Sequence, residues 1–423
     1  MRIRSSFVTV IALALSTTAV CGGNWPDWRG PGRNSVITGS GYPQSWSEKS
    51  NVLWKTPLPG WGTSSPAIWG EQIYVTYEDK GSNGLVCLGR DGKERWKLVI
   101  GKSSEGRNRK ASGANPSPVT DGQHVYVYFK SGDLACVGTD GELDWKINLQ
   151  ARYGADRLNW DLGTSPVLTD HGVLVAVMHA GPSYVVSLDK RTGQELWKQD
   201  RDLGAPAESR DSYSTPCVIQ SGEHEIAVVL GADHVTAYRA DNGSELWRVG
   251  GLNPDDRRNF RSIASPVVSD RTVIAPYARG GTLTSIQLGG QGDVTGSHVD
   301  WTLTGASADV PTPVAFEGRV YLCGDRGDVT CVEIKSGKLL WTERLPRNRY
   351  PYSSSPLIVA GHLYLTREDG TTFVLALGDK PKLVSTNILR ENTYATPAFA
   401  DGRLFMRTST FLFCIGDKAN EAK

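Results

Sequence analysis

Short stretches in which apolar and polar positions alternate follow one another along nearly the whole chain, separated by polar turns. The clearest begin at a Ser/Thr-Pro step, as in PSPVTDGQHVYVY from Pro116 and SSPLIVAGHLYLT from Ser354. Alternation with a period of two predicts β-strands with one buried face, and the Asp-Gly and similar turns between them predict hairpins. The chain is therefore expected to consist of many short antiparallel strands.

The Ser/Thr-Pro step occurs eight times, at intervals of 41 to 52 residues. In each copy the proline is followed by a short strand, a turn, an alternating strand, a third strand, a polar turn and a fourth strand. Four antiparallel strands per unit of about 40–50 residues predict an all-β, eight-bladed β-propeller, in which each blade is buried against its neighbours. The repeat prolines are Pro66, Pro118, Pro166, Pro216, Pro266, Pro313, Pro356 and Pro397.

A polar turn followed by a short apolar step and a tryptophan also recurs within these units. It reads TGQELW from Thr192, NGSELW from Asn242 and SGKLLW from Ser336. We expect each indole to be a large apolar plate between adjacent blades rather than a group that stacks on a cofactor. The predicted structural tryptophans are Trp54, Trp96, Trp145, Trp197, Trp247, Trp301 and Trp341.

The two ends of the repeat region share one predicted blade. No fourth strand follows FLFCIG at the C-terminal end, whereas NVLWKTP from Asn51 supplies a spare strand with Trp54 at the blade tryptophan position. This N-terminal strand is expected to complete the C-terminal blade and close the ring, which removes the edge strands. The seventh copy, KPKLVSTNIL from Lys380, has no tryptophan, so the pattern leaves the docking of that blade unexplained.

Residues 1–21 have the features of a signal peptide. Arg2 and Arg4 precede an apolar run and then small residues, and the run is too short to span a bilayer. The protein is therefore expected to be periplasmic or secreted. Lipid attachment at Cys21 is disfavoured because the preceding residue, a valine, is not small.

The remaining boundaries follow from the repeats. Residues 22–50 are expected to form a leader that packs on the propeller of residues 51–416, and residues 417–423 a disordered tail. Trp25 and Trp28 of the leader are expected to dock as a clasp on the propeller, with presentation to a partner as the alternative.

Charge and cysteine content narrow the functional classes. The 423 residues contain 46 Lys and Arg and 45 Asp and Glu, so binding to nucleic acid through net charge is not expected. Most cysteines fall at one repeat position, which indicates a small buried slot. This position holds Cys87, Cys136, Cys331 and Cys414, and Ser187 and Ala237 in other copies. A disulfide between Cys323 and Cys331 across a hairpin is left open.

The repeats SLDKRTGQELW, AYRADNGSELW and CVEIKSGKLLW resemble those of the PQQ-like (pyrroloquinoline-quinone-type) propeller family. The resemblance covers about residues 25 to 416. The chain is also similar to the BamB-type eight-bladed scaffold of the outer-membrane β-barrel assembly machinery, and NWPDWRGPGRN resembles the leader of exported bacterial members. These motifs are specific for the fold and nearly silent on function.

The family resemblance implies one cofactor to consider. Quinoprotein alcohol dehydrogenases with these repeats hold PQQ and a calcium ion and carry a disulfide between adjacent cysteines. The chain has no adjacent cysteine pair and no C-x-x-C-H haem attachment site. Both features count against electron transfer, so a cofactor is not expected and a PQQ-dependent oxidoreductase is an alternative.

The sequence contains no contiguous catalytic motif. Among its seven histidines only His179 and His234 are expected to approach each other, and neither has the spacing of a metal site. A third class, a carbohydrate-active hydrolase or lyase, would draw its acids from channel-mouth loops, with Asp161, Asp211 and Asp309 as candidates.

The segments that connect one blade to the next are irregular and should gather on one face of the ring. Arginine and aromatic residues mix there, and both are favoured at binding surfaces. We therefore expect a monomeric, non-catalytic scaffold without a membrane span that recruits a protein or glycan through this loop-rich face, although solvated loops would also fit. The candidate rim comprises Arg107, Arg109, Tyr153, Arg157, Trp160, Arg210, Arg257, Arg258, Arg347, Arg349 and Tyr350.

Overall fold

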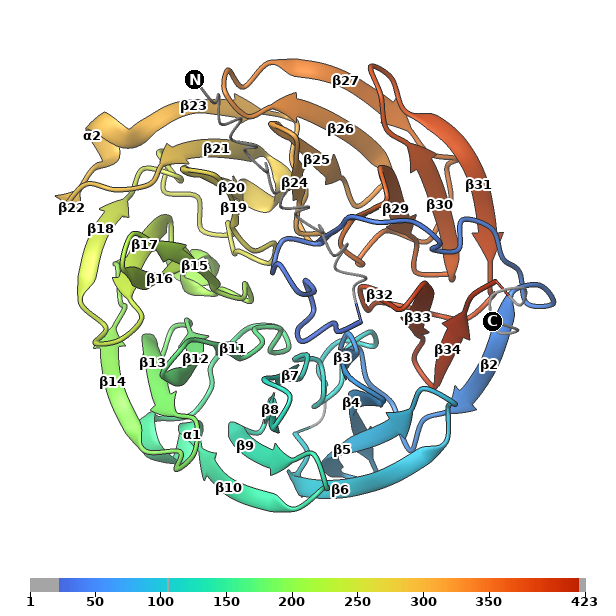
Figure 1. Cartoon of the computed structure of the whole chain (residues 1–423). Helices are drawn as coiled ribbons and strands as arrows, with labels where there is room; N and C mark the ends of the chain where they lie inside the picture. Colours follow the sequence, from blue (N-terminus) through green and yellow to red (C-terminus); the bar gives the residue numbers. More distant parts are fainter. Residues whose placement is uncertain (1–22, 105, 418–423) are drawn as a thin grey trace, which may run out of the picture.

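The protein is described from a computed structural model that covers residues 23–104 and 106–417. The expected signal peptide and residues 418–423 of the expected tail lie outside the described residues. Eight sheets of mostly antiparallel strands surround a central axis (Figure 1), which confirms the predicted eight-bladed propeller.

The strands of each blade run in order from the axis outwards. The first blade contains β3 (Ala67–Trp69), β4 (Gln72–Asp79), β5 (Ser82–Gly89) and β6 (Glu94–Lys102). The second contains β7 (Val119–Thr120), β8 (His124–Tyr128), β9 (Asp133–Gly138) and β10 (Leu143–Asn148). The third contains β11 (Val167–Leu168), β12 (Gly172–Val177), β13 (Tyr184–Asp189) and β14 (Glu195–Asp200). The fourth contains β15 (Cys217–Ser221), β16 (His224–Gly231), β17 (His234–Arg239) and β18 (Glu245–Val249).

The second half of the ring repeats this order. The fifth blade contains β19 (Val267–Ser269), β20 (Thr272–Tyr277), β21 (Thr282–Gln287) and β23 (Val299–Thr304). The sixth contains β24 (Val314–Phe316), β25 (Arg319–Cys323), β26 (Asp328–Glu333) and β27 (Leu339–Arg344). The seventh contains β28 (Leu357–Val359), β29 (His362–Thr366), β30 (Thr371–Ala376) and β31 (Lys382–Ile388). The eighth contains β32 (Ala398–Ala400), β33 (Arg403–Arg407), β34 (Phe411–Ile415) and β2 (Val52–Pro57).

Few elements lie outside this pattern. Two short strands, β1 (Val36–Ile37) and β22 (Gly292–Asp293), add parallel partners to β28 and β18. The helical turns are α1 (Leu149–Tyr153), η1 (Ala207–Arg210), η2 (Ala278–Gly280) and α2 (Thr295–His298). Among the described residues, no helix is both long and apolar enough to cross a bilayer.

The ring closes where the chain ends meet. β2 pairs antiparallel with β34, and Trp54 lies opposite Cys414 in the register. This confirms that the N-terminal strand completes the C-terminal blade. The closure leaves the eighth blade with four strands although only three come from its own repeat.

The blade tryptophans contact the next blade through both ring and N–H. The indole N–H groups of Trp54, Trp96, Trp145, Trp197 and Trp301 donate to backbone carbonyls of the following blade at 2.8–3.0 Å. The ring of Trp197 lies over Gly243, which has φ +74°, and a Cβ there would stand 2.4 Å from the ring. A glycine in this turn therefore provides both the left-handed backbone and the space for the indole.

The seventh blade receives its missing tryptophan from the leader. Trp46 is 3% exposed and stacks on Tyr364 of β29, with ring centroids 6.5 Å apart and planes 8° apart. In the first, second and sixth blades a tyrosine of the second strand contacts the blade's own tryptophan, as Tyr321 contacts Trp341. The backbone N–H of Trp46 donates a hydrogen bond to Asn387 Oδ1 of β31 at 2.8 Å. This bond holds the leader against the strand that lacks a tryptophan. Trp46 thereby belongs to one core cluster with residues of the seventh and eighth blades.

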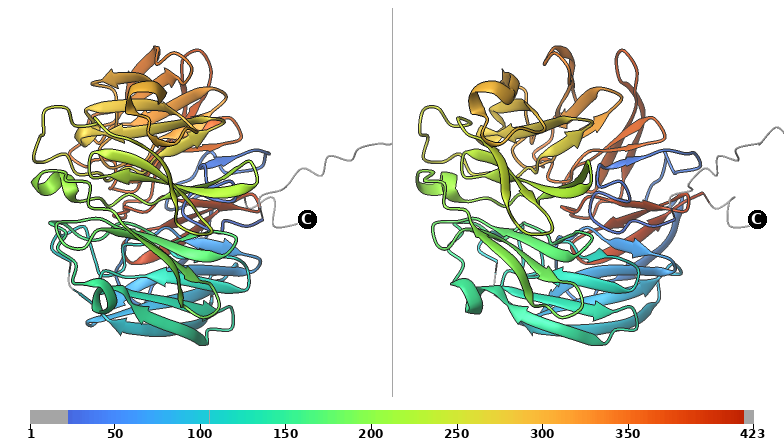
Figure 2. Two further views of the ribbon diagram at one scale, coloured as in Figure 1. Left: turned by 90° about the vertical axis from the view of Figure 1, so that its left-hand side faces the viewer. Right: turned by 60° about the vertical axis from the view of Figure 1, so that its left-hand side comes forward.

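The first part of the leader crosses the centre of the ring (Figure 1). Trp25 is fully buried and exchanges two backbone hydrogen bonds with Ile68 of the first blade, at 2.8 and 2.7 Å. Arg29 donates to the carbonyl of Pro313 in the sixth blade, and β1 pairs with the seventh. In the side views of Figure 2 this segment, in blue, lies on the side opposite the projecting green and yellow loops.

The disulfide left open by the sequence is not formed. Cys323 lies opposite Val329 and Cys331 opposite Tyr321, so the two thiols do not face each other across the hairpin. Among the described residues no cysteines are joined in a disulfide.

Candidate functional site

A closed circle of hydrogen bonds surrounds the central channel. The residue before each repeat proline is Ser or Thr, and its hydroxyl accepts a hydrogen bond from the backbone N–H of the equivalent residue in the preceding blade. The eight distances are 2.9–3.1 Å, and the last bond runs from Thr396 to Ser65 and closes the circle. The members are Ser65, Ser117, Ser165, Thr215, Ser265, Thr312, Ser355 and Thr396. The Ser/Thr-Pro step thus joins every blade to the next.

Loss of one hydroxyl should open this circle. Replacing Ser165 with alanine leaves the N–H of Ser117 without its acceptor, and is expected to lower the free energy of unfolding by about 1–3 kcal/mol. Ser165→Thr keeps the hydroxyl and is the matched control, because other copies use threonine. Urea unfolding of the two variants measures the difference, and equal stability would show that the circle does not stabilise the ring.

The channel inside this circle forms a cavity of about 240 Å³. Its wall consists mainly of the hydroxyl circle together with Asn115, Tyr213 and Tyr394. Trp28 of the leader also lines it. The cavity is therefore walled mainly by hydroxyl groups, and the leader contributes an aromatic side chain.

The chemistry of this cavity does not fit PQQ with calcium. Calcium binds six to eight oxygen ligands, usually including carboxylates. Among the described lining residues none is acidic, and the one charged group, Lys110, pairs with Glu368 at 2.8 Å. The hydroxyls already accept backbone hydrogen bonds. The arrangement suits a small neutral polar ligand better than a quinone with a divalent cation.

The three candidate catalytic carboxylates each hold neighbouring loops together. Asp161 accepts from the ammonium of Lys130 and from two backbone N–H groups at 2.8–3.0 Å. Asp211 accepts from the backbone and side-chain N–H of Asn159 at 2.9 Å, and burial raises the pKa of its carboxyl. Asp309 receives two hydrogen bonds from the Arg261 guanidinium, at 3.0 and 2.9 Å. Each of these carboxylates thus links loops through at least one oxygen, while Asp211 Oδ1 is buried without a hydrogen-bond partner among the described residues.

One part of the candidate rim forms a patch around Trp160. Its ring is 46% exposed although its backbone N–H donates to the Tyr213 hydroxyl at 3.0 Å and its indole N–H to Glu208 at 2.9 Å. Glu208 lies 3.7 Å from Arg261 and 3.8 Å from Arg279. A fixed, half-exposed tryptophan that is linked through a glutamate to two arginines has the composition of an interface hot spot.

The other candidate rim residues are dispersed. Arg257, Arg258 and Arg347 are exposed, and Arg157 is exposed on the Trp160 loop. The Arg107 guanidinium donates a hydrogen bond to the Leu158 carbonyl of this loop. The Arg210 guanidinium donates to the Ala205 carbonyl of its own loop. Arg349 lies over the ring of Tyr350, and Arg109 lines a separate hollow.

Tyr153 does not belong with the rest of the rim. It lies in α1, contacts Tyr184 edge to face at 4.9 Å, and donates to Glu195 of the outermost strand of the third blade. Its ring therefore packs on the flank of that blade.

The chain matches a known protein family over most of its length. A family model described as outer membrane protein assembly factor BamB matches overlapping segments, residues 31–181, 81–247, 157–293 and 288–380. The outer membrane protein assembly factor BamB of Yersinia pestis is 24% identical over 392 residues, which is 88% of this chain and 90% of the relative.

Two solved structures share the fold. BamB from Moraxella catarrhalis has a TM-score of 0.62 at 15% identity, covering 87% of this chain and 97% of that one. A europium-containing methanol dehydrogenase has a TM-score of 0.69 at 10% identity, covering 93% of this chain and 98% of the other. At these identities the likeness concerns the fold alone.

Proposed function

This chain belongs to the family described as outer membrane protein assembly factor BamB, and on that premise we propose that it is a non-catalytic scaffold that binds a protein partner in outer membrane protein assembly. The binding surface is the loop-rich face, with Trp160 as its anchor. The observation that carries the proposal is the exposed Trp160, held by two hydrogen bonds, one of them to Glu208, which also pairs with Arg261 and Arg279.

The pre-organisation of this face supports binding of a protein. A side chain that is already fixed loses little conformational freedom when a partner docks, so more of its contact area contributes to affinity. The links through Asp161, Asp211 and Asp309 hold the neighbouring loops in the same way. Arg157 on the same loop and Arg279 beside Glu208 are exposed, and their guanidinium groups would supply directed hydrogen bonds to carboxylates or carbonyls of the partner.

The alternative activities find less support in the geometry. The cavity does not offer the ligand set of a quinone–calcium site, and the likeness to methanol dehydrogenase is one of fold. The carboxylates considered for a carbohydrate-active enzyme are each engaged by a lysine, an asparagine or an arginine. A periplasmic or secreted location fits the N-terminal sequence and the name that the relatives carry.

Photo-crosslinking in the native cell envelope tests the proposal. Benzoylphenylalanine at position 160 is expected to form an adduct with a protein of the outer membrane assembly apparatus. Leu143, 42% exposed at the start of β10 near the opposite face, is the matched control position and should not give this adduct. The absence of a specific protein adduct at position 160 would contradict the proposal and favour the glycan alternative.

The purified partner then allows a quantitative measurement. Trp160→Ala is expected to weaken binding by about 2 kcal/mol, or roughly 30-fold in Kd, as at other aromatic hot spots. Leu143→Ala should leave Kd unchanged. Calorimetric titration of both variants against the same partner measures the two values.

A further inference from the structure

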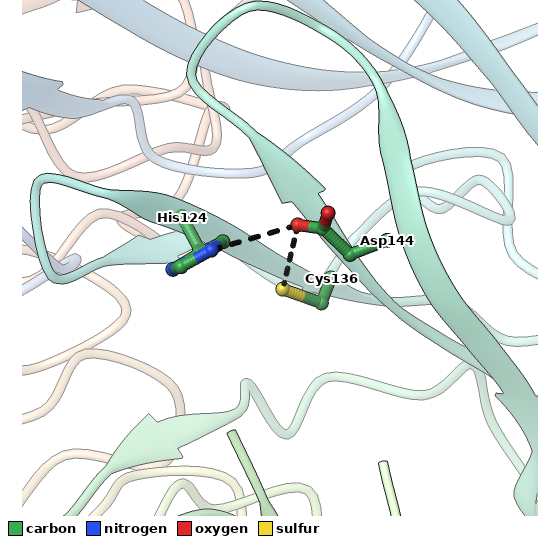
Figure 3. Close-up of side chains that lie close together, drawn as sticks. All are labelled: His124, Cys136 and Asp144. Atoms are coloured by element: carbon green, nitrogen blue, oxygen red, sulfur yellow. Dashed lines mark hydrogen bonds and ion pairs between the residues drawn. The ribbon is translucent and has the colours of Figure 1, made fainter. Parts of the chain in front are cut away.

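Three side chains with metal-binding atoms converge on the second blade (Figure 3). His124 is the first residue of β8, Cys136 lies in β9 and Asp144 lies in β10. Asp144 Oδ2 lies 3.6 Å from His124 Nε2 and 3.6 Å from Cys136 Sγ, and the three ligand atoms lie within 4.8 Å of one another. In the part of the chain that the structure describes, this is the one group of three or more such ligands.

The two distances from Asp144 Oδ2 match the spacing of neighbouring ligand atoms around a tetrahedral ion. Zinc binds sulfur, nitrogen and oxygen at about 2.0–2.3 Å, which places neighbouring ligand atoms about 3.3–3.8 Å apart. We propose that His124, Cys136 and Asp144 bind a zinc ion, with the fourth position open to solvent. His124 and Asp144 are partly exposed, with 31% and 41% of their side chains accessible, so an ion can reach the site from outside.

A carboxylate stands behind the histidine, as in many zinc sites. Asp121 Oδ1 lies 3.8 Å from His124 Nδ1, the ring nitrogen that would not face the metal. Asp121 is itself fixed, because Oδ1 accepts from the backbone N–H groups of Gln123 and His124 at 3.0 and 2.9 Å, and Oδ2 accepts from the Tyr126 hydroxyl at 3.3 Å. This contact would orient the imidazole and make Nε2 a better ligand.

The repeat provides an internal comparison. The same cysteine slot occurs in three other blades, where it is a packing position without metal-binding neighbours. Two positions correspond to His124 and Asp144: the first residue of the second strand and the residue before the blade tryptophan. In the other three blades they hold Gln72 and Arg95 (with Cys87), Arg319 and Leu340 (with Cys331), and Arg403 and Leu53 (with Cys414). The second blade combines the thiol with an imidazole and a carboxylate.

A nucleophilic Cys–His–Asp arrangement is the competing interpretation of these residues. Cys136 is fully buried, so a substrate cannot reach its thiol. An inaccessible thiol is a poor nucleophile. A cation placed between the three groups would instead stabilise the thiolate, which is the form that binds zinc.

The site is independent of the proposed partner-binding face. His124 is the first residue of the second strand and Asp144 the second residue of the fourth strand. Each follows a turn within the blade, and these turns lie on the side opposite the loops that connect the blades. A bound ion would link three of the four strands of the blade. Its effect is therefore expected on the stability of the blade, with partner binding at Trp160 unchanged.

Cobalt substitution tests the site directly. Untagged mature protein, freed of metals by a chelator, is titrated with Co²⁺, and zinc affinity is measured by competition. We expect one equivalent to give a thiolate-to-cobalt charge-transfer band that zinc abolishes. Cys136→Ser should remove the band, whereas Cys331→Ser, the same slot in the sixth blade, should retain it.

Two exposed ligands allow a test that does not depend on the buried cysteine. His124→Gln and Asp144→Asn should each weaken zinc binding at least tenfold, and Asp121→Asn by roughly tenfold, because it acts through the histidine. Circular dichroism checks that each variant remains folded. The proposal would be overturned if the parent protein gave no charge-transfer band, or if the band were unchanged in His124→Gln and Asp144→Asn.

Discussion

Replacing Trp46 with alanine is expected to lower the free energy of unfolding by about 3–5 kcal/mol, the usual cost of removing a buried indole from a core. The reason is specific to this chain. Trp46 is 3% exposed, stacks on Tyr364 and belongs to the core that joins the seventh and eighth blades. Since the fourth strand of the seventh blade carries no tryptophan, no other indole fills this place.

The control for this variant lies on the same blade. Leu383 in β31 is 51% exposed, and Leu383→Ala should change stability by no more than about 0.5 kcal/mol. Trp46→Phe should recover part of the loss because the stacking on Tyr364 is retained. Urea unfolding monitored by circular dichroism measures all three. A loss of less than about 1 kcal/mol in Trp46→Ala would show that the leader is not part of the core.

The contrast between Trp46 and Trp54 shows what the sequence can predict. Trp54 stands in a segment that matches the fourth strand of the repeat, so its place in the eighth blade follows from counting strands. Trp46 has no counterpart in any copy. Its partner is 318 positions away in sequence, and only the folded ring brings Tyr364 beside it.

The hydroxyl circle is an intermediate case. Either serine or threonine stands before each of the eight prolines, and no other residue type occurs there. That restriction indicates that a hydroxyl is needed, but a one-dimensional repeat does not reveal that the partner is the equivalent residue of the next blade. The sequence therefore shows that a hydroxyl is required before each proline, but only the closed ring shows which backbone N–H it binds.

The candidate sites depend on register more than on motif. His124, Cys136 and Asp144 are separated by 12 and 8 residues and meet only because three strands pair in one register. The spacing of the histidines therefore predicted no metal site, although alignment of the four strands of each blade would have placed these three residues on neighbouring strands. The rim was predicted as a group, but Tyr153 turns to the flank of its blade because it lies in α1.

The second large effect is expected at Asp161, where alanine should lower the free energy of unfolding by about 3–5 kcal/mol. The carboxylate is 2% exposed and pairs with Lys130, whose side chain is 10% exposed. It also accepts from the backbone N–H groups of Arg107 and Asn108. Without it, the ammonium of Lys130 stays in the interior without this counter-charge and the loop of residues 106–111 loses its anchor.

A double-mutant cycle separates the ion pair from the loop anchor. Lys130→Met with Asp161→Ala should cost less than the sum of the two single variants, because neither charge is then buried alone. Asp202→Asn removes the charge of an exposed carboxylate in the next connecting segment; it is the control and should stay within about 0.5 kcal/mol. If Asp161→Ala were as stable as the parent protein, the carboxylate would be free of a structural role. Its assignment as a link between loops would then be wrong, and a catalytic role for it would have to be considered again.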